Sequence, residues 1–148
     1  MGIRLRWVAA LAALASAGAM TAEGRSDGQF QIKLKASLRN QGEIAWASFA
    51  PNGDTTAMVL NVSGVPSYFV RPVRLYTYIY RGNCAQLPAS PAYELNEVVA
   101  PSRRSGPPFT LNKSVPLPSS QLRSGGYSVV VRSSPPDGNI DLFCGDVS

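Results

Sequence analysis

The residue types available for catalysis are the first constraint on this chain of 148 residues. It contains no histidine and only two cysteines, Cys84 and Cys144. Without histidine there is no Ser-His or Cys-His catalysis, no imidazole acid–base chemistry and no histidine-ligated metal site. Two cysteines are too few for a four-cysteine zinc or iron–sulfur site. We find no phosphate-binding loop, GxSxG motif or dinucleotide fingerprint, and we predict a protein that is not an enzyme, with no metal and no cofactor.

Three tyrosines stand at alternate positions in one β-rich segment. Tyr76, Tyr78 and Tyr80 alternate with aliphatic and threonine side chains, so on a strand they share the face opposite the core. Phenol ionises near pH 10, and a tyrosine is therefore a poor metal ligand without help. The tyrosines are candidates for packing or for binding rather than for catalysis.

Two charged clusters are weaker candidates. Glu94 and Glu97, three residues apart, could share a cation, and Arg103 with Arg104 could bind an acidic partner; for both pairs the alternative is a solvated loop. The formal net charge is +5 for the whole chain. It falls to +3 if Arg4 and Arg6 are removed by cleavage of the N-terminal segment, which is not the footprint of a nucleic-acid-binding protein.

The first 22 residues have the layout of a secretory signal peptide. Two arginines precede a short apolar run, Trp7–Ala15, and small residues follow it at Ala17–Ala19 and Met20–Ala22. The run is too short to span a bilayer, and no later apolar stretch is long enough to do so. We therefore predict a signal peptide over residues 1–22 and one domain over residues 23–148 of a periplasmic or secreted protein, with no membrane span after cleavage.

The predicted domain consists of strands nearly throughout. Apolar and polar residues alternate with period two in most segments, and Asn-, Gly-, Pro- and Asp-rich turns separate them. The expected strands are Gln29–Leu38, Glu43–Ala50, Thr55–Val62, Pro72–Tyr80, Phe109–Val115, Gly126–Ser133 and Ile140–Cys144, with an optional short strand near Tyr93–Leu95. A turn at Ser119–Leu122 could form one helical turn, and a long proline-rich loop occupies residues 82–108. This pattern predicts an all-β Greek-key β-sandwich or flattened barrel of seven to eight antiparallel strands.

The two cysteines of an exported chain are expected to form a disulfide. Only one intrachain pairing exists, Cys84 to Cys144, across 60 residues. Closing such a loop stabilises the fold by roughly 4 kcal/mol as an upper guide, and it would tie the long loop to the last strand. The alternative is a pair of free buried thiols.

The order of several short motifs resembles the copper/zinc superoxide dismutase-like β-sandwich family in its bacterial exported form, over about residues 30–147. That family has a His-x-His pair on a strand, a cysteine a few residues later, a late Val-x-Val-His-like strand and a closing Cys-Gly. The matching segments are Tyr78–Cys84, Gly126–Arg132, Phe143–Asp146 and, earlier, Gly42–Phe49, Pro51–Asn61 and Gly64-Val65-Pro66. Domains of the chordin-repeat type are similar at this level.

The resemblance places Tyr78, Tyr80 and Arg132 at positions where the family has metal-binding histidines. Arginine stays protonated and is not a ligand, so the resemblance implies a non-catalytic member that lacks the Cu/Zn site. It also implies that these three side chains face outward beneath the loops, where Arg132 could stack on a tyrosine. Two interpretations remain open: Tyr76 and these three residues form a second small core, or they line a binding surface together with Trp46, since Tyr, Trp and Arg are enriched at binding hot spots.

Three functions are therefore compatible with the sequence. The first is a non-enzymatic superoxide dismutase-like domain that acts as a binding or structural module of the cell envelope, with an unknown protein or small-molecule ligand. The second is a metal-binding protein or enzyme with non-histidine ligands such as Tyr78, Tyr80, Glu94 and Glu97. The third is a carbohydrate- or peptide-binding module with a Tyr/Trp surface.

Overall fold

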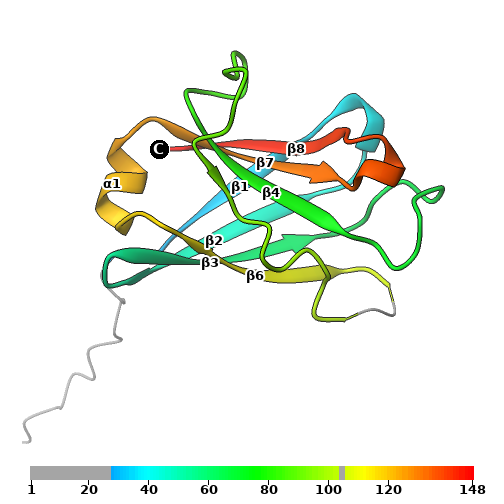
Figure 1. Ribbon diagram of the computed structural model, residues 1–148, viewed down its shortest axis with the longest axis horizontal. Coiled ribbons are helices and arrows are strands. Elements are labelled where there is room, and N and C mark those ends of the chain that lie inside the picture. Colours follow the sequence, from blue (N-terminus) through cyan, green and yellow to red (C-terminus); the bar gives the residue numbers. More distant parts are fainter. Residues whose placement is uncertain (1–27, 104–105) are drawn as a thin grey trace, which may run out of the picture.

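The computed structural model describes residues 28–103 and 106–148, which form an all-β domain (Figure 1). The predicted signal peptide, residues 1–22, lies outside the described residues. Eight antiparallel strands are present: β1 (Phe30–Ala36), β2 (Ala45–Asn52), β3 (Thr55–Val62), β4 (Leu75–Arg81), β5 (Tyr93–Glu94), β6 (Phe109–Val115), β7 (Tyr127–Ser133) and β8 (Asp141–Val147). Short helices lie between them: η1 (Leu38–Asn40), α1 (Ser119–Ser124) and η2 (Pro135–Asp137). No helix in these two ranges is long and apolar enough to cross a membrane.

The strands form one nearly closed sheet in the order β5-β4-β7-β8-β1-β2-β3-β6. β1 joins its two halves, because Phe30–Leu34 pair with β2 whereas Lys35 and Ala36 pair with β8. The chain crosses between the halves from β3 to β4, from β5 to β6 and from β6 to β7, so that β7 lies beside β4. Connections of this kind define a Greek key, and the predicted fold class is confirmed. The two ends of the order, β5 and β6, are not paired, which leaves an open seam.

Period-two alternation builds a single core between the two halves. The inward residues of β4 are Leu75, Thr77 and Ile79, and each is fully buried. Val129 and Val131 of β7 join the same apolar cluster. The alternating faces seen in the sequence are thus the two faces of the barrel wall, and the tyrosines of β4 lie on the outer face.

The strand bounds agree with the sequence-based expectations within a few residues. The optional fifth strand is present, and the expected turn at Ser119 is helix α1. The largest differences, of three residues, are at two bounds: β4 begins at Leu75 rather than Pro72, and β8 continues to Val147 rather than ending at Cys144. Proline has no N–H to donate to a sheet, so Pro72 cannot donate to the ladder at the expected start of β4. The C-terminal extension of β8, Gly145–Val147, pairs with Tyr127–Val129 of β7.

Candidate functional site

The outer face of β4, β7 and β8 holds the tyrosines and Arg132 in cross-strand rows. Tyr76 pairs with Arg132, Tyr78 with Val130, and Tyr80 with Ser128. Residues directly opposite each other in an antiparallel pair share a face and touch. The register therefore brings the three tyrosines and Arg132 together, as the sequence-based hypothesis required.

A disulfide closes over part of this face. Cys84 and Cys144 are bonded, with their Cα atoms 5.8 Å apart, which confirms the predicted pairing. Because Val130 lies between Tyr78 of β4 and Cys144 of β8 in the register, the chain after β4 crosses β7 to reach β8. The Cys84 N–H also donates to Asp146 Oδ1 at 2.8 Å. The start of the long loop is thus fixed to the last strand by a covalent bond and a hydrogen bond.

The chain that crosses β7 covers three outward-facing residues that lie outside the main core. Val130 and Ser128 have no exposed surface, and Tyr80 is 3% exposed. Neither Val130 nor Tyr80 belongs to the apolar cluster inside the barrel, so their burial comes from what lies over the sheet. Tyr76 and Tyr78 are half-buried. A second small core therefore exists beneath the crossing chain, and its open edge is formed by Tyr76 and Tyr78.

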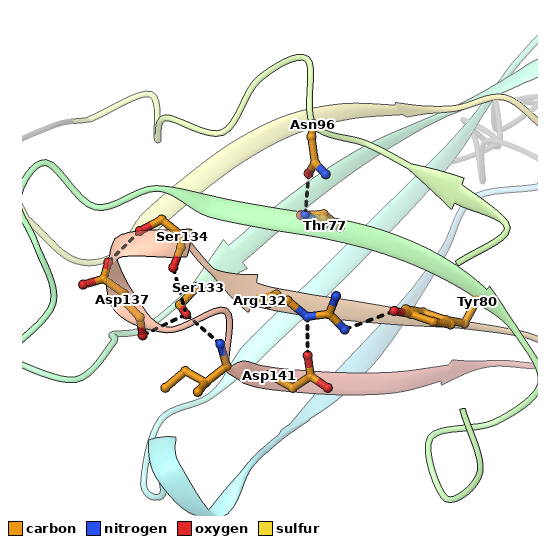
Figure 2. A network of polar contacts seen from close by, with 9 residues as sticks. Thr77, Tyr80, Asn96, Arg132, Ser133, Ser134, Asp137 and Asp141 are labelled. Atoms are coloured by element: carbon orange, nitrogen blue, oxygen red, sulfur yellow. Dashed lines mark hydrogen bonds and ion pairs between the residues drawn. The ribbon is translucent and has the colours of Figure 1, made fainter. Parts of the chain in front are cut away.

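Arg132 contacts two tyrosines of this second core and a neighbouring carboxylate, and Figure 2 shows its bonds to Tyr80 and Asp141. Its guanidinium carbon lies 4.7 Å from the ring centroid of Tyr78. Its Nη2 donates to the Tyr80 hydroxyl at 3.0 Å, and its Nε forms an ion pair with Asp141 Oδ1 at 2.6 Å. A stacked guanidinium contributes about 0.5–2 kcal/mol depending on its solvation. The Arg132 side chain thus makes a cation–π contact, a hydrogen bond and an ion pair at the same time.

A β-bulge places Asp141 within reach of Arg132. The register of β7 and β8 shifts between Val131 and Arg132, so that Arg132 faces Asp141 rather than the next residue of an unbroken ladder. An extra residue in one strand re-aims the side chains beyond it. Burial alone would lower the pKa of Arg132, but the hydrogen bonds to Asp141 and Tyr80 and the charges of those groups raise it above its ordinary value. Arg132 is therefore a permanent cation at this site.

Trp46 lies apart from the tyrosines. It is on β2, and β7, β8 and β1 stand between β2 and β4 in the sheet. Its side chain is 37% exposed, and Lys33 Nζ lies 5.9 Å from its ring centroid. Trp46 thus belongs to a different wall of the barrel from Tyr76, Tyr78, Tyr80 and Arg132.

The open seam between β5 and β6 holds the two glutamates. Glu94 and Glu97 line a cavity of about 260 Å³, together with Lys113 of β6. The Lys113 ammonium donates to the carbonyl oxygen of Leu95 at 2.9 Å and also to that of Val98. Burial lowers the pKa of Lys113 from 10.5 to about 8. An ammonium in the same cavity opposes cation binding by the glutamates, and no cluster of three or more His, Cys, Asp or Glu side chains suited to a metal ion occurs in the described part of the chain.

Lys113 is a buried residue that was not among the candidates from the sequence. Its signal was present, since Phe109, Leu111 and Val115 alternate on the buried face of β6 and Lys113 occupies the third position of that series. A lysine in register with core residues indicates a buried ammonium with backbone partners. It ties the segment after β5 to β6, across the gap where the strands themselves do not pair.

Arg103 is exposed at the end of the long proline-rich segment, and Arg104 lies outside the described residues.

Comparisons of the chain with protein-family models, with curated proteins and with solved structures find no match. A function for this chain must therefore be inferred from its own side chains and their geometry.

Proposed function

We propose that this chain is a non-enzymatic, exported domain of the superoxide dismutase-like kind that lacks the Cu/Zn site and acts as a binding or structural module of the cell envelope. One observation carries the proposal. The three positions that resemble the family's histidines, Tyr78, Tyr80 and Arg132, are in contact through Arg132, which also pairs with Asp141.

The chemistry of that network argues against metal binding at the same place. A guanidinium stays protonated and repels a divalent cation. The Tyr80 hydroxyl accepts a hydrogen bond from Arg132, which occupies a lone pair that a metal would need. The residues that would serve as ligands are thus committed to packing.

Export is supported by the disulfide and by the N-terminal sequence. Structural disulfides persist in oxidising compartments and are rare in cytosolic proteins. Here the bond fixes the chain that covers the second core. A protein made in a reducing compartment would lose that constraint, so the architecture suits a periplasmic or secreted location.

The test measures metal binding and dismutation on purified, oxidised protein. Protein incubated with Cu(II) and Zn(II) and then dialysed is expected to hold far less than one metal per chain and to give no dismutation beyond that of the buffer. Tyrosine absorbance followed during the same titration is expected to stay constant at micromolar metal. One tightly bound copper per chain with rapid dismutation, both lost in Tyr78→Phe, would overturn the proposal and favour a metal protein with non-histidine ligands.

Export is tested separately with the 148-residue chain expressed in a bacterial host. We expect a periplasmic product whose N-terminus begins near residue 23 and whose thiol assay finds no free cysteine. An uncleaved cytoplasmic product with two free thiols under native conditions would contradict the exported assignment.

A binding role for the other wall of the barrel has one specific observation in its favour. Trp46 and Ile44 are 37% and 49% exposed, and Lys33 lies over the Trp46 ring. An exposed indole beside a cation suits the flat face of a sugar ring or an extended peptide. Screening against soluble glycans and peptides with Trp46→Ala as the control would test this second candidate, and equal binding by Trp46→Ala and the parent would refute it.

A further inference from the structure

We propose that an arginine cleft formed by Arg71, Arg74 and Arg103 binds a ligand with two neighbouring phosphate-type groups. The cleft lies where two loops meet, the connection from β3 to β4 and the segment that precedes β6. It is distinct from the seam at Lys113 and from the wall that carries Trp46, and it goes beyond the proposed function because it gives the module a ligand class. It rests on that function only in treating the domain as a binding module.

Two small cavities make up the arginine cleft. The first has a volume of about 100 Å³ and is lined by Arg71, Arg74 and Arg103 together with Phe109. The second has a volume of about 180 Å³ and is lined by Arg71, Arg74, Tyr76 and Ser134. Since Arg71 and Arg74 line both cavities, the two are adjacent. Each is below the roughly 300 Å³ at which pockets begin to enclose a drug-sized ligand, so each suits one compact group.

The three arginines of the cleft have no ion-pair partner among the described residues. All are exposed, and the one ion pair in the described ranges joins Arg132 to Asp141. The Asp137 carboxylate of the neighbouring turn forms no ion pair with these arginines; it accepts hydrogen bonds from the Val70 N–H at 2.8 Å and the Ser134 hydroxyl at 2.9 Å. Three like charges around shared cavities repel one another, and an oxyanion would relieve that repulsion.

The surrounding loops are held in place before any ligand arrives. The bond from Val70 to Asp137 joins the β3–β4 connection to η2, and Figure 2 shows Asp137 and Ser134 at that corner. On the other side, the Ser102 N–H donates to the Thr110 carbonyl at 2.9 Å, and the Leu75 N–H donates to the Val99 carbonyl at 2.8 Å. Fixing the backbone in advance lowers the entropic cost of binding.

The charge and shape favour phosphate over carboxylate. Guanidinium groups form bidentate bonds with both, but a phosphate monoester carries about −1.5 to −2 against −1 for a carboxylate. Three positive charges divided between two adjacent cavities match two phosphoryl groups in series. Tyr76 on the wall of the second cavity carries a hydroxyl that can supply a further donor.

Tripolyphosphate is the probe, with orthophosphate and hexaglutamate as comparisons, measured by isothermal titration calorimetry at low salt. We expect tripolyphosphate to bind at least about tenfold more tightly than orthophosphate, because it can occupy both cavities. Arg71→Gln/Arg74→Gln is expected to weaken tripolyphosphate binding by about a hundredfold with an unchanged or higher thermal midpoint, since removal of unpaired like charges does not destabilise the fold.

The matched control is Lys33→Gln/Lys35→Gln, which removes the same charge from the exposed face of β1 and is expected to retain binding within about threefold. Arg71→Lys/Arg74→Lys keeps the charge without the planar fork and is expected to lose about tenfold. Equal losses in the β1 variant, full affinity in the lysine variant, or hexaglutamate binding as tight as tripolyphosphate would overturn the inference. None of these outcomes depends on metal, so failure here is distinguishable from failure of the proposed function.

Discussion

Lys113 gives the sharpest test of the structure, because burial lowers its pKa into a range where unfolding can be measured. The side chain is 7% exposed and bonds to the carbonyl oxygens of Leu95 and Val98. The chain has no histidine, and both cysteines are in the disulfide. Among the described residues, Lys113 is the side chain whose pKa is displaced from its ordinary value into the range between pH 7 and 9.5. Folding therefore changes its protonation in that window.

The sign of the pH dependence comes from the lowered pKa. The pKa of Lys113 is about 8 in the folded protein, against 10.5 for an exposed lysine. Between these two values the unfolded chain binds more protons than the folded chain, so the free energy of unfolding rises with pH. Proton linkage gives at most about 2 kcal/mol between pH 7 and 9.5. Since Lys113 lines a cavity that water can enter, we expect about 1–2 kcal/mol.

The assay is urea unfolding at 25 °C at several pH values from 7 to 9.5, followed by tryptophan fluorescence, for the parent and for Lys113→Met. Methionine keeps the length of the side chain and removes the charge. The parent midpoint is expected to move to higher urea with an unchanged slope m, and the variant midpoint is expected to stay nearly constant. A flat profile in the parent, or the same rise in Lys113→Met, would refute the assignment of a buried ammonium at the seam.

Three further substitutions test other parts of the structure. Cys84→Ala opens a 60-residue loop and should lower the stability by up to roughly 4 kcal/mol, seen as a fall of several degrees or more in thermal midpoint; an unchanged midpoint would mean that the bond does not hold the covering chain. Arg132→Met should cost about 1–2 kcal/mol, and a double-mutant cycle with Asp141→Asn should give a coupling of roughly 0.5–1 kcal/mol; zero coupling would contradict the ion pair. Thr77→Val replaces a fully buried hydroxyl that has no hydrogen-bond partner among the described residues and should raise the free energy of unfolding by about 1 kcal/mol; a clear loss would indicate a hidden partner.

The strands and their faces could be predicted because period two is a local property of the sequence. The alternation in β4 assigned Leu75, Thr77 and Ile79 to the core and the tyrosines to the other face, and the structure agrees. The disulfide followed from arithmetic, since two cysteines allow one intrachain pair. Both inferences needed no knowledge of which strands are neighbours.

The grouping of distant residues could not be predicted in the same way. Trp46 and Tyr78 are both outward-facing, but the sheet order puts three strands between them, and that order depends on nonlocal pairing. The ion pair of Arg132 with Asp141 required a bulge in the β7–β8 ladder, which no alternation pattern signals. Arg71, Arg74 and Arg103 meet only because two loops without regular structure converge.

Different interactions hold the segments that cover the outer face of the barrel and its open seam. On the outer face, Cys84 and Cys144 fix the crossing chain covalently, and Arg132 satisfies the polar groups of Tyr80 and Asp141 beneath and beside it. At the seam, the Lys113 ammonium donates hydrogen bonds to two backbone carbonyl oxygens. The cost of removing that ammonium from water offsets part of the stability that these bonds contribute. The outer face therefore depends on oxidation through its disulfide, whereas the seam depends on pH through Lys113.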